Sequence, residues 1–197
     1  MTNIWNERYA SDEYIYGTEP NVFFSEKLIQ LKPGKILLPA EGEGRNAVFA
    51  AKKGWQVTAF DNSIEGQKKA LHLAEKEGVS ISYLFDSYDS ANFQTAYFDC
   101  IALIYTHMPA GKRTFYHQKL VSFLKPGGYL ILEGFSKNQL LFNSGGPKNY
   151  EMLFSVEELK SDFHDINIIQ IEATETELKE GTYHNGKASV IRLFATR

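Results

Sequence analysis

Short apolar runs alternate with stretches of helical periodicity over most of the chain. The apolar runs predict strands at residues 35–40, 55–60, 80–85, 98–105 and 129–133. The stretches between them predict helices at residues 44–53, between Ser63 and Gly78, and at residues 111–124. Strands that alternate with helices in this way form a mostly parallel, doubly wound α/β sheet with helices on both faces.

The C-terminal part of the chain has a different pattern. Apolar runs at residues 166–177 and 188–196 are joined through residues 180–186, with no helix between them. Asn185-Gly186 is typical of a tight turn between antiparallel strands. The chain is therefore expected to end in an antiparallel hairpin that extends the parallel sheet.

Three segments lie outside this strand and helix pattern. Lys125-Pro-Gly-Gly128 predicts a turn before the fifth strand. Residues 136–152 have no sustained periodicity, and a loop of this length in a compact domain is commonly functional, so we expect it at the active site. A short helix follows at residues 155–162, where Ser155 and Glu158 fit a capping box.

The N-terminal segment, residues 1–21, is rich in aromatic residues. Its sequence WNERYASDEYIYGTEPN contains one Trp and three Tyr among charged and turn-forming residues. A helix is expected from Asn3 to Ala10 and another from Phe23 to Leu31. The whole chain, residues 1–197, is expected to form a single domain with a sizeable core.

Composition narrows the class of protein. The net charge of −3 gives no electrostatic case for binding nucleic acid, which usually needs a basic face. The only cysteine, Cys100, lies in an apolar run, so we expect a buried strand thiol and neither a disulfide framework nor a metal site. No signal peptide and no membrane-spanning run is visible. The expectation is a cytoplasmic enzyme or binding protein with a small-molecule partner.

The stretch ILLPAEGEGRNAVFAAKKGWQVTAFD, residues 36–61, carries the clearest functional signal. A strand leads into a glycine-rich turn, a helix and a second strand that ends at Asp61. Glycines let the backbone approach a ligand, and the N-terminus of the helix offers free N–H groups to it. An acid about 20 residues after the glycines can accept hydrogen bonds from ribose hydroxyls. The stretch predicts a cofactor of the adenosine type.

Two cofactor classes remain open at this point. Gly42-Glu43-Gly44, followed by Ala47 in the third position, is compatible with a dinucleotide such as NAD. However, the second half of the chain ends in a hairpin rather than in another nucleotide-binding half. An NAD-dependent oxidoreductase is therefore the weaker alternative.

Further motifs define a family resemblance. They are the AEGEGRN loop, Asp61, Asp86 after the third strand, Tyr105-Thr106-His107-Met108-Pro109 after the fourth, and FLKPGGYLIL. With these motifs the chain resembles the Rossmann-like (class I) S-adenosylmethionine-dependent methyltransferases. Its aromatic N-terminus is similar to that of the tellurite-resistance and thiopurine methyltransferase branch. The resemblance implies a sheet of order 3-2-1-4-5-7-6, S-adenosylmethionine as cofactor, and a small acceptor such as a thiol or a metalloid anion.

The resemblance also implies which residues hold the cofactor. Ala40, Glu41 and Gly42 would lie under its methionine part, and Tyr105 close to the same end. Asp61 would hold the ribose, and Asn62, Asp86 and Ser87 would surround the adenine. Tyr16, with Trp5 and Tyr9, would belong to an N-terminal lid, which we place at residues 1–21.

Two positions depart from the family pattern. Leu38 replaces the usual strand acid, which commonly helps to bind the ammonium group of the cofactor, and Ala40 replaces the first loop glycine. Glu41 could supply the missing charge, or it could be a solvated loop acid. A protein that binds S-adenosylmethionine but catalyses weakly or not at all is therefore the main alternative to an active methyltransferase.

The acceptor side is less specified. His107, just after the fourth strand, is the candidate general base, although a histidine bonded to backbone is the alternative. Arg113, Tyr150 and His184 are the candidate substrate-binding residues, and Glu133 and Phe135 are candidates for the pocket wall. The Asn/Asp-Pro-Pro-aromatic turn of nucleic-acid and protein amino-methylating enzymes is absent from the strand-4 end, which favours a small acceptor.

Overall fold

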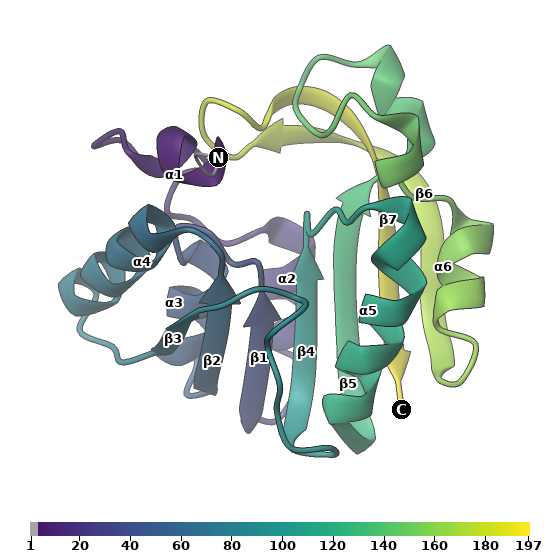
Figure 1. Ribbon diagram of the computed structural model, residues 1–197, viewed down its shortest axis with the longest axis horizontal. Coiled ribbons are helices and arrows are strands. Elements are labelled where there is room, and N and C mark those ends of the chain that lie inside the picture. Colours follow the sequence, from purple (N-terminus) through teal and green to yellow (C-terminus); the bar gives the residue numbers. More distant parts are fainter. Residues whose placement is uncertain (1–3) are drawn as a thin grey trace.

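The computed structural model describes residues 4–197, so Asn3, the expected first residue of the N-terminal helix, lies outside the described residues. The strands form one seven-stranded sheet in the order β3-β2-β1-β4-β5-β7-β6 (Figure 1). This confirms the strand order that the resemblance implied. The strands are β1 Lys35–Pro39, β2 Gln56–Asp61, β3 Ser82–Phe85, β4 Phe98–Ile104, β5 Leu124–Phe135, β6 Asn167–Lys179 and β7 Asn185–Thr196.

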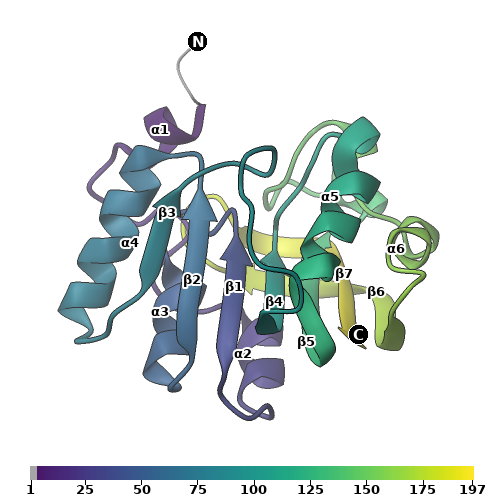
Figure 2. The ribbon, with the colours of Figure 1, turned by 60° about the horizontal axis from the view of Figure 1, so that its bottom comes forward.

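Helices cover both faces of the sheet (Figures 1 and 2). In Figure 1, α5 lies in front of the sheet and α2 and α3 lie behind it. The α-helices are α1 Ile4–Tyr9, α2 Val22–Leu28, α3 Arg45–Lys52, α4 Ile64–Lys76, α5 Ala110–Phe123 and α6 Val156–Asp162, and the 3₁₀ helices are η1 Lys137–Leu141 and η2 Tyr150–Met152. The doubly wound architecture predicted from the alternating pattern is confirmed.

The core explains why the central strands are apolar at nearly every position. Ile36 and Leu38 of β1 pack on the side of α2, α3 and α4, whereas Leu37 packs in the cluster that includes α5 and α6. In β4, Cys100 and Ile101 divide between the two clusters in the same way, and all five side chains are fully buried. A strand buried on both faces has no polar side, which is the signature of a central parallel strand.

Two expectations about the C-terminal half were wrong in detail. Residues 125–128 are part of β5, because Leu124 pairs with Phe98 before the register shifts and Gly127 donates to the C-terminal carbonyl of Arg197 at 2.6 Å. The second error concerns the hairpin. Asn185 pairs with Lys179 inside the β6–β7 ladder, so the turn is residues 180–184 rather than Asn185-Gly186. The hairpin itself is confirmed, but its loop is longer than a two-residue turn.

A buried polar cluster joins α5 to α6. Asp162 accepts hydrogen bonds from Arg113 Nε at 2.7 Å and Thr114 Oγ1 at 2.6 Å, and it also pairs with His117 Nδ1 at 2.9 Å. Glu158 lies 3.6 Å from the Arg113 guanidinium. Burial alone would raise the pKa of Asp162, but the hydrogen bonds from His117, Arg113 and Thr114 outweigh it and lower the pKa to about 2. The carboxylate is therefore ionised and holds the two helices together.

Replacing Asp162 by Ala is expected to lower the free energy of unfolding by about 3 kcal/mol, because it leaves the buried Arg113 charge with only the more distant Glu158 as partner. Urea denaturation at pH 7 measures this loss. Asp165→Ala is the matched control, since the Asp165 side chain is 77% exposed and pairs only with the exposed His164. A loss for Asp162→Ala no larger than that of the control would contradict a structural role for the cluster.

Candidate functional site

The glycine-rich turn after β1 has the backbone conformation that its sequence indicates. Gly42 and Gly44 both have positive φ, at 59° and 88°, and Gly42 donates its N–H to Asp61 Oδ2 at 3.1 Å. A Cβ added at Gly42 would lie 2.6 Å from the hydroxyl of Tyr9, so only glycine fits there. Ala40 also has positive φ, at 49°. It therefore adopts the left-handed conformation in which family members have glycine.

Asp61 is the carboxylate at the end of β2, and it is 6% exposed. Its second oxygen, Oδ1, accepts from the N–H of Ser63 at 2.9 Å, which orients the carboxylate toward the glycine turn. Burial raises its pKa to about 6, against the opposing effect of the backbone N–H groups of Gly42, Ser63 and Asn62. A carboxylate has room for further hydrogen bonds beyond these, so Asp61 can still accept from a ligand hydroxyl.

The other predicted adenine-side residues lie beside Asp61. The N–H of Asp86 donates to the carbonyl of Asp61 at 3.0 Å, which places the ends of β2 and β3 next to each other. Asp86 Oδ1 accepts from Ser87 N at 2.8 Å and from the hydroxyl of Ser90. Asn62 is exposed and follows Asp61 directly. The structure thus brings Asp61, Asn62, Asp86 and Ser87 to one edge of the sheet.

Glu41 has a role that the sequence did not indicate. Its Oε1 accepts from the N–H of Ala47 at 2.7 Å, and its Oε2 lies 3.5 Å from Asn46 Nδ2. The carboxylate therefore caps the N-terminus of α3 and is not a solvated loop acid. Burial raises the pKa of Glu41 to about 7. A cation that approached it would stabilise the ionised form.

The segment between α1 and α2 is tied to the start of α3 by two buried charged residues. Glu43 accepts from the backbone N–H groups of Ile15 and Tyr16, each at 3.3 Å, and pairs with Lys69 Nζ at 2.5 Å. Arg45 donates to the carbonyl of Tyr16 at 3.1 Å. The N-terminal segment is therefore held directly above the glycine turn, where the lid was expected.

Aromatic contacts continue this attachment along the lid. The rings of Trp5 and Tyr9 stack at 5.6 Å, and Tyr9 lies 6.4 Å from Tyr16. Arg8 donates to the hydroxyl of Tyr16 at 3.0 Å, and its guanidinium lies over the rings of Trp5 and Tyr183. Tyr183 belongs to the β6–β7 turn, so the lid contacts the C-terminal hairpin.

Four rings meet at the end of β4. His184 is the centre of this ring cluster, with centroid distances of 4.5 Å to Tyr16, 4.4 Å to Tyr105 and 5.1 Å to Phe135. Tyr105 and Phe135 are also in contact, at 4.7 Å. The turn between β6 and β7 thus folds over the end of β4 and brings His184 together with two predicted cofactor residues.

The candidate base His107 is not available for catalysis in this arrangement. Its Nδ1 lies 2.8 Å from the carbonyl of Met152, and its Nε2 accepts from the N–H of Phe135 at 3.0 Å. Burial lowers its pKa to about 4, and the ring stacks on Phe154 at 4.6 Å. Both ring nitrogens serve backbone groups, so the structure favours the alternative in which His107 is structural.

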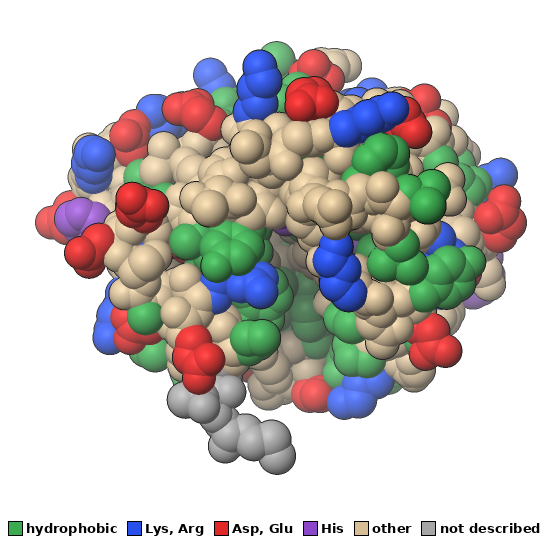
Figure 3. Space-filling model, turned by 90° about the horizontal axis from the view of Figure 1, so that it is seen from above, with side chains coloured by type: hydrophobic (Ala, Val, Ile, Leu, Met, Phe, Trp, Pro, Cys, Tyr) green, Lys and Arg blue, Asp and Glu red, His purple; other side chains and the backbone are tan. Residues whose placement is uncertain are grey.

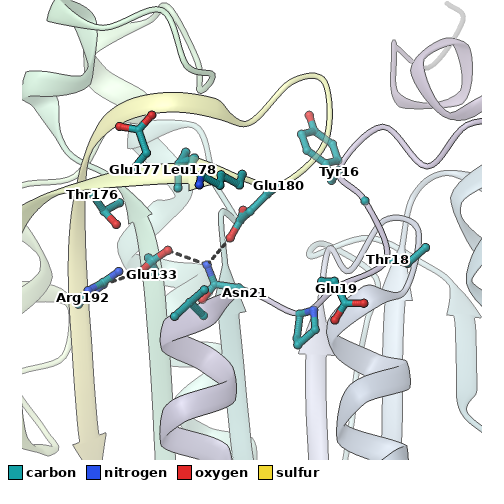
Figure 4. A pocket seen from close by; sticks show the side chains of 14 residues that line it. Tyr16, Thr18, Glu19, Asn21, Glu133, Thr176, Glu177, Leu178, Glu180 and Arg192 are labelled. Carbon is teal, nitrogen blue, oxygen red and sulfur yellow. Dashed lines mark hydrogen bonds and ion pairs between the residues drawn. The ribbon is translucent and has the colours of Figure 1, made fainter.

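Beneath the ring cluster lies a buried network of charges. Glu133 accepts from Tyr105 Oη at 2.8 Å, from Asn21 Nδ2 at 2.6 Å and from Arg192 Nε at 2.6 Å. Glu180 accepts from the same Asn21 Nδ2 at 3.0 Å (Figure 4). Asn21 therefore links the centre of the sheet to the hairpin.

A cavity of about 270 Å³ lies beside this network. In Figure 4 the carboxylates of Glu133 and Glu180 both point toward the side-chain amide of Asn21. The lining residues of the cavity are Tyr16–Val22, Glu133, Thr176–Glu180 and Arg192. Tyr16 is the predicted cofactor residue that lines it; the glycine turn, Asp61 and Asp86 do not, so the cavity does not include the edge where those residues meet. Figure 3 shows that the upper face is hollowed near its middle, between hydrophobic side chains.

Two predicted substrate residues are not brought to the site. Arg113 is committed to Asp162 and Glu158 between α5 and α6. Tyr150 is 54% exposed on η2, with Lys137 Nζ over its ring at 4.9 Å. The loop of residues 136–152 does reach the ring cluster, because a Cβ on Gly145 would collide with the ring of His184.

Sequence reasoning missed the charged residues that assemble the site. They are Glu43, Arg45 and Glu180, together with the polar Asn21, and all are buried or nearly so; Glu180 links Arg45 to Asn21. The sequence held a weak signal for two of them, since Glu43 and Arg45 are charged residues inside a glycine turn that faces the ligand edge. No local pattern pairs Arg45 with Glu180, because 135 residues separate them.

The residues present fit a cofactor of the S-adenosylmethionine type. The crowded Gly42 cradle admits only glycine, and Asp61 and Asp86 offer acceptors at the adjoining strand ends. Glu41 offers a partly buried acid at the helix N-terminus. Among residues 4–197 no group of His, Cys, Asp and Glu is arranged to hold a metal ion, and no helix there has the length and apolar character needed to cross a membrane.

Comparisons with known proteins agree with this geometry. A family model described as a methyltransferase domain matches residues 36–128. No curated protein sequence matches the chain. TehB from Haemophilus influenzae superposes with a TM-score of 0.74 and 18% identity over 98% of this chain, which spans only 65% of the length of TehB.

Two further solved structures are similar along most of their length. A protein from the conversion of a disulfide bond into a thioacetal group during echinomycin biosynthesis has a TM-score of 0.77 and 16% identity, over 100% of this chain and 91% of its own. A SAM-dependent methyltransferase from Methanosarcina mazei has a TM-score of 0.67 and 21% identity, over 91% of this chain and 98% of its own. At these identities the likeness is one of fold.

The fold is that of the class I, Rossmann-like methyltransferases, with the C-terminal antiparallel hairpin in its expected place. Residues 36–128 match a methyltransferase-domain family model, and the cofactor that this match and the structural relatives imply is S-adenosylmethionine. The resemblance and the cofactor predicted from the sequence are confirmed.

Binding of S-adenosylmethionine is expected to weaken by about tenfold or more as the pH falls from 7.5 to 5.5. Without ligand, Glu41 (pKa about 7) and Asp61 (pKa about 6) become increasingly protonated as the pH falls over that range. A cationic or hydroxyl-donating ligand favours the ionised carboxylates, so binding releases protons. Isothermal titration in two buffers of different ionisation enthalpy measures that release.

The control for this prediction is Glu41→Gln, which should lose the larger part of the pH dependence because Glu41 has the higher pKa. An affinity that is unchanged over the whole pH range in the unaltered protein would contradict the prediction.

Proposed function

We propose that this protein transfers a methyl group from S-adenosylmethionine to a small-molecule acceptor, such as a thiol or another soft nucleophile. The observation that carries the proposal is the closed carboxyl edge of the sheet. There the predicted cofactor residues Gly42, Asp61 and Asp86 adjoin one another beneath an N-terminal lid held by Glu43 and Arg45.

The proposed methyl transfer needs few catalytic groups from the protein. When bound, S-adenosylmethionine supplies a methyl group on a positively charged sulfur, a carbon already activated for displacement. The protein must bind the cofactor, exclude water and align the acceptor. Gly42 and Asp61 are the residues proposed to bind it, and the rings of Tyr16 and Tyr105 close the edge on the acceptor side.

A small acceptor fits the closure of this edge. The lid and the β6–β7 turn are in contact through Arg8 and Tyr183, and through Tyr16 and His184. A macromolecular substrate would have to displace both segments. The net charge of −3 offers no general attraction for nucleic acid. The likeness to a protein of disulfide-to-thioacetal conversion supports a sulfur acceptor.

The alternative, a protein that binds the cofactor without catalysing efficiently, rests on Leu38 and Ala40. Leu38 is fully buried in the core cluster beneath α2 and α3, so it provides packing where family members have an acid. Ala40 adopts the required left-handed conformation. The exchange at Ala40 therefore preserves the shape of the loop, and only the lost charge at Leu38 remains to be offset by Glu41.

The first test is isothermal titration with S-adenosylmethionine, S-adenosylhomocysteine and NAD in parallel. We expect both S-adenosyl ligands to bind and NAD not to bind. Asp61→Ala should weaken binding by about tenfold or more, because it removes a charge-assisted hydrogen-bond acceptor for the ribose. Asp89→Ala is the control, since Asp89 is an exposed acid in the loop after β3 whose partners, Lys112 and Tyr116, belong to α5.

If neither S-adenosyl ligand binds, the proposed function is wrong. If both bind but neither thiols nor metalloid anions nor small phenols are methylated, the cofactor-binding alternative is the better description.

Ala40→Gly tests whether the loop departure matters. Glycine removes a left-handed strain of about 1–2 kcal/mol and adds about 0.5–1 kcal/mol of backbone entropy cost, so a small net gain in unfolding free energy is expected. The affinity for S-adenosylmethionine should change by no more than about twofold. Thermal denaturation and titration measure the two effects, and a large gain in affinity would show that alanine impairs the site.

A further inference from the structure

The turn between β6 and β7 holds a carboxylate–histidine pair that the cofactor residues do not use. Glu180 Oε2 lies 3.3 Å from Nδ1 of His184, four residues later. The His184 ring is 6% exposed and is fixed by Tyr16, Tyr105 and Phe135 on different sides. Glu180 is in turn fixed by Arg45 at 2.8 Å and by Asn21. The pair is therefore rigidly placed at the end of β4.

The partners of Glu180 determine which nitrogen of His184 carries its proton. Hydrogen bonds from His184 and Arg45 outweigh burial and lower the pKa of Glu180 to about 2, so its carboxylate is ionised and accepts a proton donor. Nδ1 of His184 is then the protonated nitrogen, and Nε2 has a free lone pair. Among residues 4–197, Nε2 makes no hydrogen bond, and it is not among the fully enclosed unpaired atoms.

The 136–152 loop lies against the Cδ2–Nε2 edge of the His184 ring. A Cβ added at Gly145 would lie 2.7 Å from Cδ2 and 3.4 Å from Nε2 of the His184 ring, so any side chain there would press on that edge. Gly145 has a φ of 135°, which favours glycine as well. Nε2 therefore faces backbone rather than a competing hydrogen-bonding side chain.

We propose that His184, oriented by Glu180, is the general base of this enzyme, and that its acceptor is a small molecule that must lose a proton, such as an alkyl thiol. This inference rests on the proposed methyl transfer and adds the residue that activates the acceptor. It replaces His107, whose two nitrogens both serve backbone groups.

The proton and electrons balance in a single step. The acceptor gives its proton to Nε2 of His184, and the acceptor atom uses its freed electron pair to bond the methyl carbon. The carbon–sulfur bond of S-adenosylmethionine breaks, and its electron pair stays on sulfur, which leaves S-adenosylhomocysteine. Glu180 stabilises the positive charge on the His184 ring, which later returns its proton to water.

The charged groups around His184 favour its neutral form before the reaction. Burial lowers its pKa, Glu180 raises it, and Arg45 from α3 and Arg8 from α1 lower it. His107 is the other titratable ring nearby, and the two rings disfavour each other's charged form. At neutral pH the ring is thus ready to accept a proton.

The test compares soft nucleophiles that differ in whether a proton must be removed from the acceptor. We use 2-mercaptoethanol, which is mostly protonated at pH 7.5, and thiophenol, which is mostly ionised, with iodide as an acceptor that has no proton. His184→Gln is expected to lower kcat by about 100-fold or more with 2-mercaptoethanol, and by much less with thiophenol or iodide. The loss with 2-mercaptoethanol should shrink as the pH rises toward the pKa of the thiol.

His164→Gln is the matched control, because His164 is exposed just after the end of α6, where its ring contacts Asp165 and the carbonyl of Ser161. Glu180→Gln should show the same selective loss, less strongly. Arg45 also pairs with Glu180, so the thermal unfolding of the Glu180→Gln protein is measured in parallel. If Glu180→Gln does not fold, the comparison rests on His184→Gln alone.

A measurement without cofactor examines the tautomer directly. In a long-range ¹H–¹⁵N spectrum of histidine-labelled protein, assigned by the His184→Gln difference, Nδ1 of His184 should be protonated and Nε2 bare. The opposite tautomer would overturn the proposal, whatever the enzyme methylates.

The outcomes separate this inference from the proposed function. If S-adenosylmethionine does not bind, the proposed function fails. If it binds and His184→Gln lowers the rate equally with all three acceptors, His184 is structural and only the inference fails. Binding without turnover of either thiol also overturns the inference.

Discussion

The closed edge of this protein depends on one buried ion pair, between Arg45 and Glu180. Arg45 begins the helix that follows the glycine turn, and Glu180 begins the turn of the C-terminal hairpin. Arg45 also holds the carbonyl of Tyr16, and Glu180 holds His184 and Asn21. Both side chains of the pair are about nine-tenths buried, so each charge needs the other. A single contact thus sets the position of the lid, the hairpin and the candidate base together.

Local sequence rules gave the architecture because each element carries its own signal. The apolar runs around Leu37 and Ile101 fit a sheet buried on both faces, and Ser63 and Ser155 do cap the helices that follow them. The strand ends at Asp61 and Asp86 followed from the same pattern. They lie side by side because the carboxyl ends of parallel strands share one edge.

The acceptor side could not be predicted in the same way, because its contacts are long-range. His107 has the right position in the sequence, but the N–H of Phe135 and the carbonyl of Met152 occupy its nitrogens. His184 lies 79 positions beyond Tyr105, yet the ring of one packs on the ring of the other. His184 was expected in the segment that joins the last two strands, residues 180–186, but no local pattern indicates which rings it meets. In the structure the turn, residues 180–184, folds back over the end of β4 and brings the ring of His184 there.

The attachment of the lid also has a consequence for the rate at which ligands exchange. The segment after α1 is bonded to Glu43 and Arg45 and touches the hairpin through Arg8 and Tyr183. A ligand can therefore enter or leave the glycine turn only when these contacts separate together. For the proposed methyl transfer, the rate at which the lid opens is therefore an upper limit to turnover, however fast the chemical step is.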